Sequence, residues 1–117
     1  MQVRKVYKNI KPELVFQQIK DFAIKQGTVI QDAKLYTSAT PDDTSLFIHR
    51  GIITFSMEGG PKKSAKECLT VHLLGKDKGS TRVIFDIDDK LFTQKKLNAL
   101  LSDLDFILGS YETKGGR

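Results

Sequence analysis

Two histidines and a single cysteine are the side chains of this chain best suited to acid–base, nucleophilic or metal chemistry. His72 and Asp86 fall in neighbouring strand-like segments, so a base and the carboxylate that orients it could meet. The alternation of polar and apolar residues places both on the polar face of a sheet. Such a face lacks the shielded pocket that shifts pKa values at catalytic sites. We therefore expect a surface pair here and no catalytic residue.

Thiol and metal chemistry also lack a complete set of groups. Cys68 shares the phase of Thr70 and His72, which predicts partial exposure, and no basic residue is fixed beside it to stabilise a thiolate. One cysteine and two histidines do not make a four-ligand zinc site. A calcium site needs six or more oxygens arranged in a cage, and a solvated strand end explains the acidic run Asp86, Asp88 and Asp89 better. We expect no metal and no cofactor.

His49 is the titratable residue that the pattern places on an apolar face. It falls in the same phase as Ile53 and Phe55, where a buried imidazole could anchor the polar end of a ligand. A bulge at Arg50 and Gly51 would turn it outward, because side chains alternate with a period of two. The sequence leaves both orientations open.

The elements that must position these residues follow from the hydrophobic pattern. Apolar residues at three- and four-residue steps predict helices at 12–26 and 93–112. Pro12 suits the first turn of the first helix, Gly27 its end, and Thr93 the N-cap of the second. Alternating residues predict five strands, at 2–8, 28–38, 44–57, 66–74 and 81–88.

This order predicts an α+β domain of the type β-α-β4-α. Short turn-rich links join the last four strands, so consecutive hairpins should make an antiparallel meander. Three of these strands have one apolar and one polar face, which is typical of a sheet covered on one side only. We expect an antiparallel sheet covered on one face by two helices, in a single domain over 1–113 with a frayed tail at 114–117. Gly51 leaves open whether 44–57 is one bent strand or two short ones.

The segment from Pro12 to Phe22 reads Pro-Glu-x-Val-Phe-x-x-Ile-x-Asp-Phe. With the strand before it and the meander and long helix after it, it resembles the start of the helix-grip proteins of the START and Bet v1-like (SRPBCC) superfamily. The resemblance covers most of the chain through the order of elements. The chain departs from that superfamily in its short length and in lacking a second short helix. It is equally similar to the TATA-box-binding-protein-like fold, a structural relative that binds nucleic acid.

The helix-grip resemblance implies an apolar cavity between a curved sheet and the C-terminal helix. It therefore implies non-enzymatic binding of a small apolar or amphipathic ligand. No catalytic motif of the superfamily has a match in this chain. The cavity would be lined by the inward positions of the sheet and helices: Phe22, His49, Ile53, Phe55, Val71, Leu73, Phe85, Leu101, Leu104 and Leu108.

The formal net charge of +5 is compatible with an alternative function, that of an interaction module for nucleic acid or protein. In a meander, alternate loops lie at opposite ends of the sheet, and one end also receives the start of the last helix with its partial positive charge. Exposed aromatic residues for base stacking are scarce, with Tyr36 and Tyr7 as candidates, so we expect weak binding at most. The basic residues gathered at this end, the lysine pole, are Lys62, Lys63, Lys66, Lys95 and Lys96.

The sequence also bears on location. No apolar run approaches the roughly 20 residues that cross a bilayer, and the N-terminal ten residues lack the apolar core of a signal peptide. A single cysteine fits a reducing compartment. We expect a cytoplasmic protein that makes no membrane contact.

Overall fold

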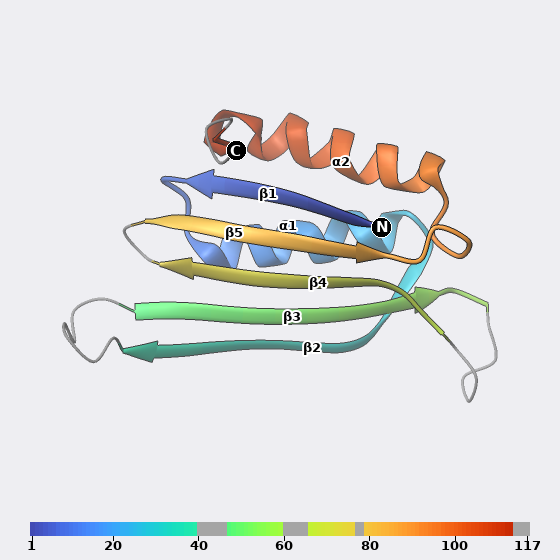
Figure 1. The fold of residues 1–117 in the computed structure, drawn as a ribbon, viewed down its shortest axis with the longest axis horizontal. Coiled ribbons are helices and arrows are strands. Elements are labelled where there is room, and N and C mark those ends of the chain that lie inside the picture. The colour runs from blue at the N-terminus through green and yellow to red at the C-terminus, as the bar shows by residue number, and fades with distance from the viewer. Residues whose placement is uncertain (40–46, 60–65, 77–78, 114–117) are drawn as a thin grey trace.

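The computed structural model describes residues 1–39, 47–59, 66–76 and 79–113. The predicted order of elements is confirmed (Figure 1). The tail at 114–117, the start of the predicted strand 44–57, and Lys62 and Lys63 lie outside the described residues. The elements are β1 (Gln2–Lys8), α1 (Pro12–Lys25), β2 (Thr28–Ala39), β3 (Phe47–Met57), β4 (Glu67–Lys76), β5 (Ser80–Ile87) and α2 (Gln94–Leu108), followed by a 3-10 turn at Gly109–Tyr111.

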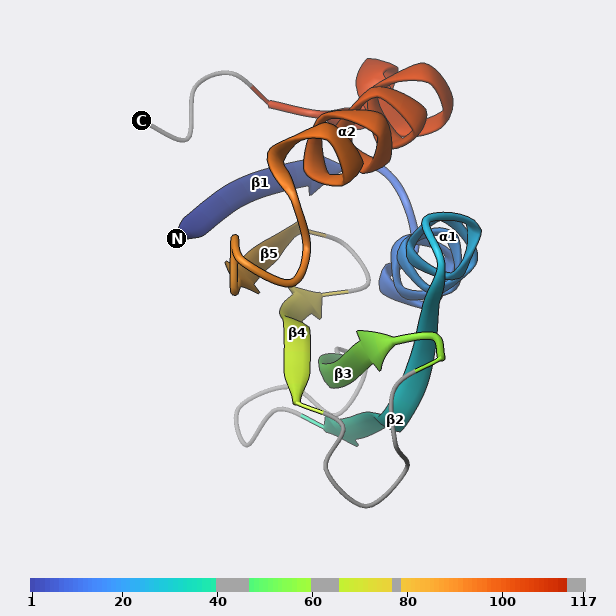
Figure 2. The same cartoon turned by 90° about the vertical axis from the view of Figure 1, so that its right-hand side faces the viewer.

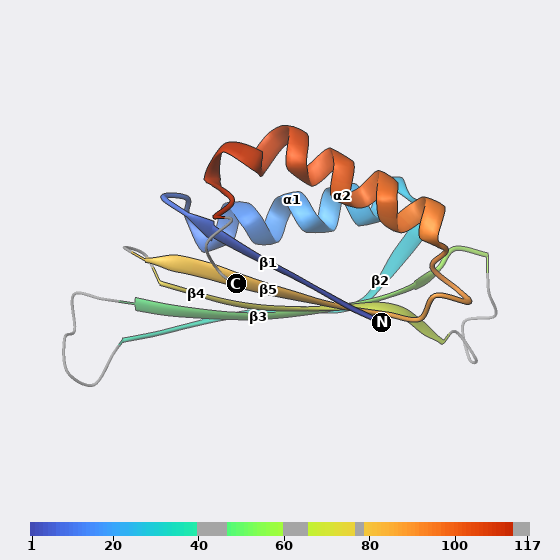
Figure 3. The ribbon, with the colours of Figure 1, turned by 45° about the horizontal axis from the view of Figure 1, so that its top comes forward.

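The five strands form one antiparallel sheet in the order β1-β5-β4-β3-β2. The first strand therefore pairs with the last, and β1 and β2 are the two edges. Both helices lie on the same side of the sheet (Figures 2 and 3). The α+β architecture with one covered face is as the sequence predicts, and the opposite face of the sheet is left open.

An apolar layer fills the space between the sheet and the helices. Val3, Phe85, Val71 and Ile53 form one row across β1, β5, β4 and β3. The last three are at most 1% exposed. From the helix side, the layer receives one stripe of α2, namely Leu97, Leu100, Leu104 and Leu108. This stripe is the helical periodicity that predicted α2.

The C-terminal end of α1 is closed by three neighbouring groups. Gly27 has a φ of +88°, a conformation that glycine adopts without strain, and it turns the chain into β2. The hydroxyl of Thr28 donates to the carbonyl of Ala23 at 2.7 Å. The ammonium of Lys96, from α2, donates to the carbonyl of Gln26 at 2.9 Å. The last carbonyls of the helix are thus satisfied, and the two helices are tied together.

Two predictions about β3 and β4 are settled by their pairing. β3 is one continuous strand through Gly51, and a Cβ at that position would lie 3.0 Å from the ring of Phe16. Cys68, which we expected to be partly exposed, is only 1% exposed. Phe55 pairs with Leu69 but Ser56 pairs with Glu67, so Cys68 is the extra residue of a bulge and turns into the core.

The predicted helix 93–112 is shorter than expected. α2 ends at Leu108, and Gly109–Tyr111 continue as a 3-10 turn. The hydroxyl of Thr93 accepts from the backbone N–H of Lys96 at 3.4 Å, as expected of the N-cap. After the turn, Glu112 bridges to Tyr7 of β1, so the chain leaves the helix to reach the sheet.

α1 begins in close contact with β4 at Gly75. A Cβ at Gly75 would lie 2.6 Å from Cγ of Pro12 and 2.6 Å from Oγ1 of Thr81. Thr81 is its cross-strand partner on β5, and the proline ring is rigid, so neither neighbour can move aside easily. The start of α1 can approach the sheet this closely only where the strand has no side chain.

We expect Gly75→Ala to lower the free energy of unfolding by about 1–3 kcal/mol, the usual cost of forcing an extra carbon into a packed core. Urea denaturation measures this loss. The matched control is Leu74→Ala, one residue away on the open face, where Leu74 is 43% exposed. It should cost no more than about 0.5 kcal/mol. Equal losses for the two variants would contradict the close contact.

Candidate functional site: the open face of the sheet

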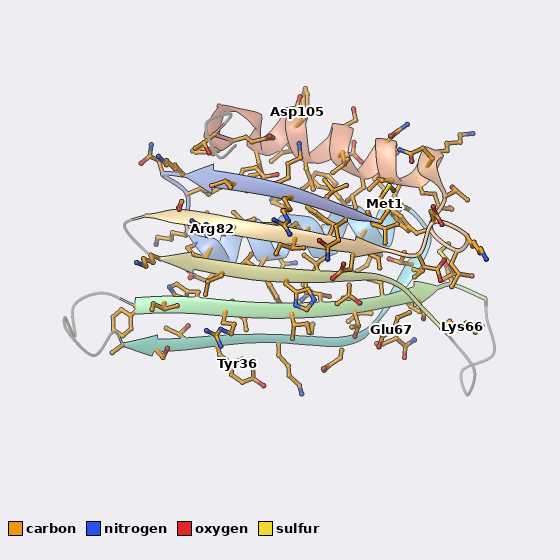
Figure 4. All side chains as sticks on the ribbon, in the orientation of Figure 1. Met1, Tyr36, Lys66, Glu67, Arg82 and Asp105 are labelled. Carbon is orange, nitrogen blue, oxygen red and sulfur yellow. The ribbon has the colours of Figure 1, made fainter. Side chains whose placement is uncertain are left out.

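The face of the sheet turned away from the helices carries three of the four arginines of the chain. Arg82 alternates with the buried Val83 along β5, so it points away from the core. Arg4 and Arg50 share its face by the same alternation and pairing. Figure 4 looks onto this open face, with Arg82 on β5 and Tyr36 on β2. The fourth arginine lies outside the described residues.

The register of the strands lines up one row of outward side chains across the whole sheet. From β1 to β2 the row is Val6, Arg82, Leu74, Arg50 and Tyr36. Neighbouring strands lie about 4.8 Å apart, so the backbones of the two arginines are about 10 Å apart, with the leucine between them. Cations therefore alternate with an apolar and an aromatic side chain in a single line.

A hollow of about 470 Å³ lies over this row and the next. The floor of the hollow is apolar, made by Ile52, Leu74 and Ile84, and polar groups stand around it. Two further hollows, of about 570 and 530 Å³, also border Arg82. We call the residues of this surface the arginine face: Arg4, Tyr36, Arg50, Ile52, His72, Leu74, Arg82 and Ile84.

Charge is distributed unequally over the open face. The carboxylates that face outward from the described strands, Asp32, Glu67 and Asp86, all lie toward one end of the sheet. Asp32 and Asp86 are 3.6 Å from Lys34 and His72, respectively. Within the described parts of the chain, Arg50 and Arg82 have no carboxylate within ion-pair distance. From the described strands, six lysine and arginine side chains face outward: Arg4, Lys8, Lys34, Arg50, Lys76 and Arg82.

The pair His72 and Asp86 lies on this surface, as predicted. The two side chains are 47% and 43% exposed, and Nε2 of the imidazole is 3.6 Å from Oδ2 of the carboxylate. Solvent screens a pair of this kind. It adds polarity at the acidic end of the open face, where His72 borders the hollow of about 470 Å³ but is open to solvent and lacks the enclosure typical of a catalytic base.

His49 points inward, toward the helices, and is only 6% exposed. Its Nδ1 lies 3.1 Å from Oε1 of Glu13 and 3.0 Å from Oγ1 of Thr37. An ionised carboxylate can only accept, so Nδ1 carries the proton that faces Glu13. The imidazole thereby fastens the first turn of α1 to β3, which is a structural role.

The row that contains His49 is the polar end of the inner face. It runs Thr37, His49, Gly75, Thr81 and Tyr7 across the five strands. The hydroxyls of Tyr7 and Thr81 are buried and have no hydrogen-bond partner among the described residues. Burial raises the pKa of Tyr7 above its ordinary value, and the charges of Glu112 and Asp105 add to the shift. Tyr7 is 1% exposed and so is unsuited to base stacking.

The residues predicted to line a cavity between the sheet and α2 do lie together, but they pack into the core. Phe22 and Leu101 are partly buried at its margin. The hollows described above lie on the open side of the sheet. Ligand binding between the sheet and α2 remains a prediction. The buried members, each at most 3% exposed, are Ile53, Phe55, Val71, Leu73, Phe85, Leu104 and Leu108.

The lysine pole is only partly a free charged surface. Lys66 and Lys95 are exposed. Lys96 is partly buried and donates to a backbone carbonyl of α1, so its ammonium already serves the fold. The sequence reasoning missed the arginine face because it grouped cations by loop. The outward phase of Arg82 was readable from its strand, but that of Arg50 depended on a possible bulge at Arg50 and Gly51, and the alignment of the two required the pairing of the strands.

The thiol of Cys68 is not a nucleophile in this fold. Burial raises its pKa from 9.0 to about 11, and the charge of Asp88 adds to the shift. The thiol is therefore protonated near neutral pH.

Because the folded pKa of Cys68 exceeds the unfolded one, the unfolded chain loses the thiol proton first as pH rises. The contribution of the buried thiol to stability is complete below pH 9 and is lost toward pH 11. We expect the free energy of unfolding to fall over this window, measured by urea denaturation at a series of pH values. Cys68→Ala should flatten the fall between pH 9 and 10, where Tyr7, whose unfolded pKa is 10.0, contributes less than the thiol. Identical slopes in the two proteins would argue against a protonated, buried thiol.

Comparison of the chain with models of protein families, with curated proteins and with solved structures finds no match. Over the described ranges, no group of three or more His, Cys, Asp or Glu side chains is placed to hold a metal ion. Neither of the described helices is long and apolar enough to cross a membrane. What the chain does has to be argued from its own surface, where the arginine face is the most distinctive feature.

Proposed function

We propose that the chain binds single-stranded nucleic acid on the arginine face. The observation that carries this proposal is the outward row of Arg82, Leu74, Arg50 and Tyr36. Guanidinium groups bind phosphates with two parallel hydrogen bonds. An exposed aromatic ring stacks on any base, and apolar side chains accept the faces of neighbouring bases. The row offers all three kinds of contact within reach of one strand.

A single strand fits this surface better than a duplex. Leu74 is 43% exposed between the two arginines, where a duplex would place charged backbone. Unstacked bases of a single strand can instead lie on it. Both helices are behind the sheet, so the open face has no projecting helix to enter a major groove (Figures 1 and 3).

The charge distribution also indicates where the strand would lie. Asp32 and Asp86 repel phosphates from one end of the open face. The other end continues from the arginines to Lys8 and Lys76, which are exposed. With this number of cations, we expect dissociation constants of about 10⁻⁴ to 10⁻⁶ M at physiological salt, as for non-specific binding.

The helix-grip resemblance implies a different function, the binding of an apolar ligand between the sheet and α2. Its lining residues fill that space with their own side chains. The open face offers hollows without any rearrangement of the core. The outward row therefore supports the nucleic-acid proposal better than the packed interior supports the ligand.

Replacing Arg50 and Arg82 together with Gln should weaken the binding of a labelled oligonucleotide. The dependence of log K on log salt should flatten by about 0.7 for each phosphate that the protein no longer neutralises. Fluorescence anisotropy in a salt titration measures both effects. The control, Lys66→Gln with Lys95→Gln, removes the same charge from the lysine pole. It should change the affinity and the salt dependence much less than the arginine variant does. If the control variant binds more weakly than the arginine variant, the binding surface is the pole.

Tyr36→Leu should cost about 1–3 kcal/mol of binding free energy, the value of one stacked base. Because no charge is removed, the salt dependence should stay unchanged. Tyr111→Leu is the control, since Tyr111 is also exposed, at 39%, but lies outside the arginine face. Equal affinity of the Tyr36 variant and the unaltered chain would exclude stacking on this ring.

A further inference from the structure

The two edges of the sheet are covered to different extents. Beside β1, Glu112 bridges to Tyr7, and the N–H of Thr113 donates to the carbonyl of Val6 at 2.8 Å. An ion pair of 3.2 Å between Lys5 and Glu112 holds this segment in place. Part of the β1 edge is thus occupied by the chain itself.

The edge of β2 carries no such cover within the described residues. None of their backbone hydrogen bonds is made from the outer side of Thr28–Ala39. A bulge lies at Gln31, between Ile30 and Asp32, and bulges protect an edge from pairing. It protects only the start of the strand, and residues 32–39 continue regular pairing to β3 without another bulge or a proline.

On the helix side, the side chains of β2 lack the charges that often protect an edge, whereas the open face of the strand carries the exposed Asp32 and Lys34. Ala33, Leu35 and Thr37 point toward the helix side, and none is charged. Inward-pointing charges are a common device against edge pairing. Leu35 is only partly buried against the core, and Tyr36, on the open face, is 59% exposed. The strand therefore offers unpaired backbone groups, flanked on the helix side by uncharged side chains.

We propose that β2 pairs with β2 of a second copy of this chain, antiparallel, about a two-fold axis at Leu35. The axis stands perpendicular to the sheet, so both copies keep their helices on the same side. Two five-stranded sheets then join into one of ten strands. The proposal does not depend on nucleic-acid binding, although it would place two arginine faces side by side.

The side chains select this register among those open to a two-fold axis. An axis at Lys34 would oppose Lys34 to itself, and like charges directly opposite are destabilising. An axis at Ala33 leaves only residues 32–34 paired before the bulge interferes.

An axis at Leu35 pairs residues 32–38 and brings Leu35 against its own copy on the helix side. On the open face, this axis sets Lys34 against Tyr36 of the partner copy twice, a favourable cation–π arrangement. An axis at Tyr36 would pair the same number of residues. It would place Leu35 opposite Thr37 of the partner copy, so the contact between the two leucines would be lost. The axis at Leu35 is therefore the one that gives both the longest paired segment and complementary side chains.

Such a contact is small beside the 1,200–2,000 Å² that stable interfaces bury. We therefore expect a dimer that forms at concentrations of roughly 10 µM to 1 mM and dissociates on dilution. Sedimentation equilibrium should show a mass that rises with concentration from 13.2 kDa toward twice that value. Leu35→Lys should keep the mass at 13.2 kDa, while Ile24→Lys, at an exposed site on α1, should not.

A cysteine scan tests the register without depending on the stability of the Leu35→Lys variant. In a Cys68→Ala background, Leu35→Cys places two thiols across the axis, where backbones about 4.5–5.5 Å apart suit a disulfide. The control Ala33→Cys lies on the same side of β2 but about 13 Å from its copy. Mild oxidation should give a covalent dimer for the first variant and far less for the second.

Three outcomes would overturn the proposal: a mass of 13.2 kDa at every concentration, equal cross-linking at positions 33 and 35, or a dimer unaffected by Leu35→Lys. A mass of 13.2 kDa at every concentration would leave the β2 edge free to pair with a strand of another protein. Failure here is separable from failure of the nucleic-acid proposal. Arg50→Gln with Arg82→Gln should leave the mass unchanged, and Leu35→Lys, on the helix side, should leave the intrinsic affinity of each chain for an oligonucleotide unchanged.

Discussion

The burial of one side of the sheet is the constraint on which the rest of the structure depends. Side chains of a strand alternate between its faces, so each residue that enters the apolar layer assigns its neighbours to the open face. Val83 and Phe85 under the helices oblige Arg82 and Ile84 to point the other way. The arrangement of the open face is therefore set by the packing of the core. A slip of one residue in β5 would exchange the two faces.

Much of this fold can be read from the sequence because the relevant signals are local. The stripe of α2, the proline that begins α1 and the glycine that ends it each act within a few residues. The positions that could not be read depend on a neighbour distant in the sequence. Cys68 turns inward because β3 and β4 shift register there, and His49 is held inward by Glu13 of α1.

The arginine face shows the same limit for function. Arg4, Arg50 and Arg82 lie far apart in the chain and come together only through the order β1-β5-β4-β3. Only the outward phase of Arg82 was predictable within its strand, and the alignment of the three depends on which strands are neighbours and in what register. The lysine pole was predicted from the positions of loops, which the order of strands alone gives. One of its members, Lys96, instead ties the two helices together.

The C-terminal segment beside β1 has a consequence for how such sheets accumulate. A sheet with two bare edges can recruit copies on either side without limit, which is the route to fibrils. Here Glu112 and Thr113 occupy part of one edge. Growth by strand addition is then hindered at that edge, and the two-fold contact proposed for β2 would use up the other edge in one step. A few residues after the last helix thus help to make assembly finite, and shortening the chain before Glu112 would remove that terminator.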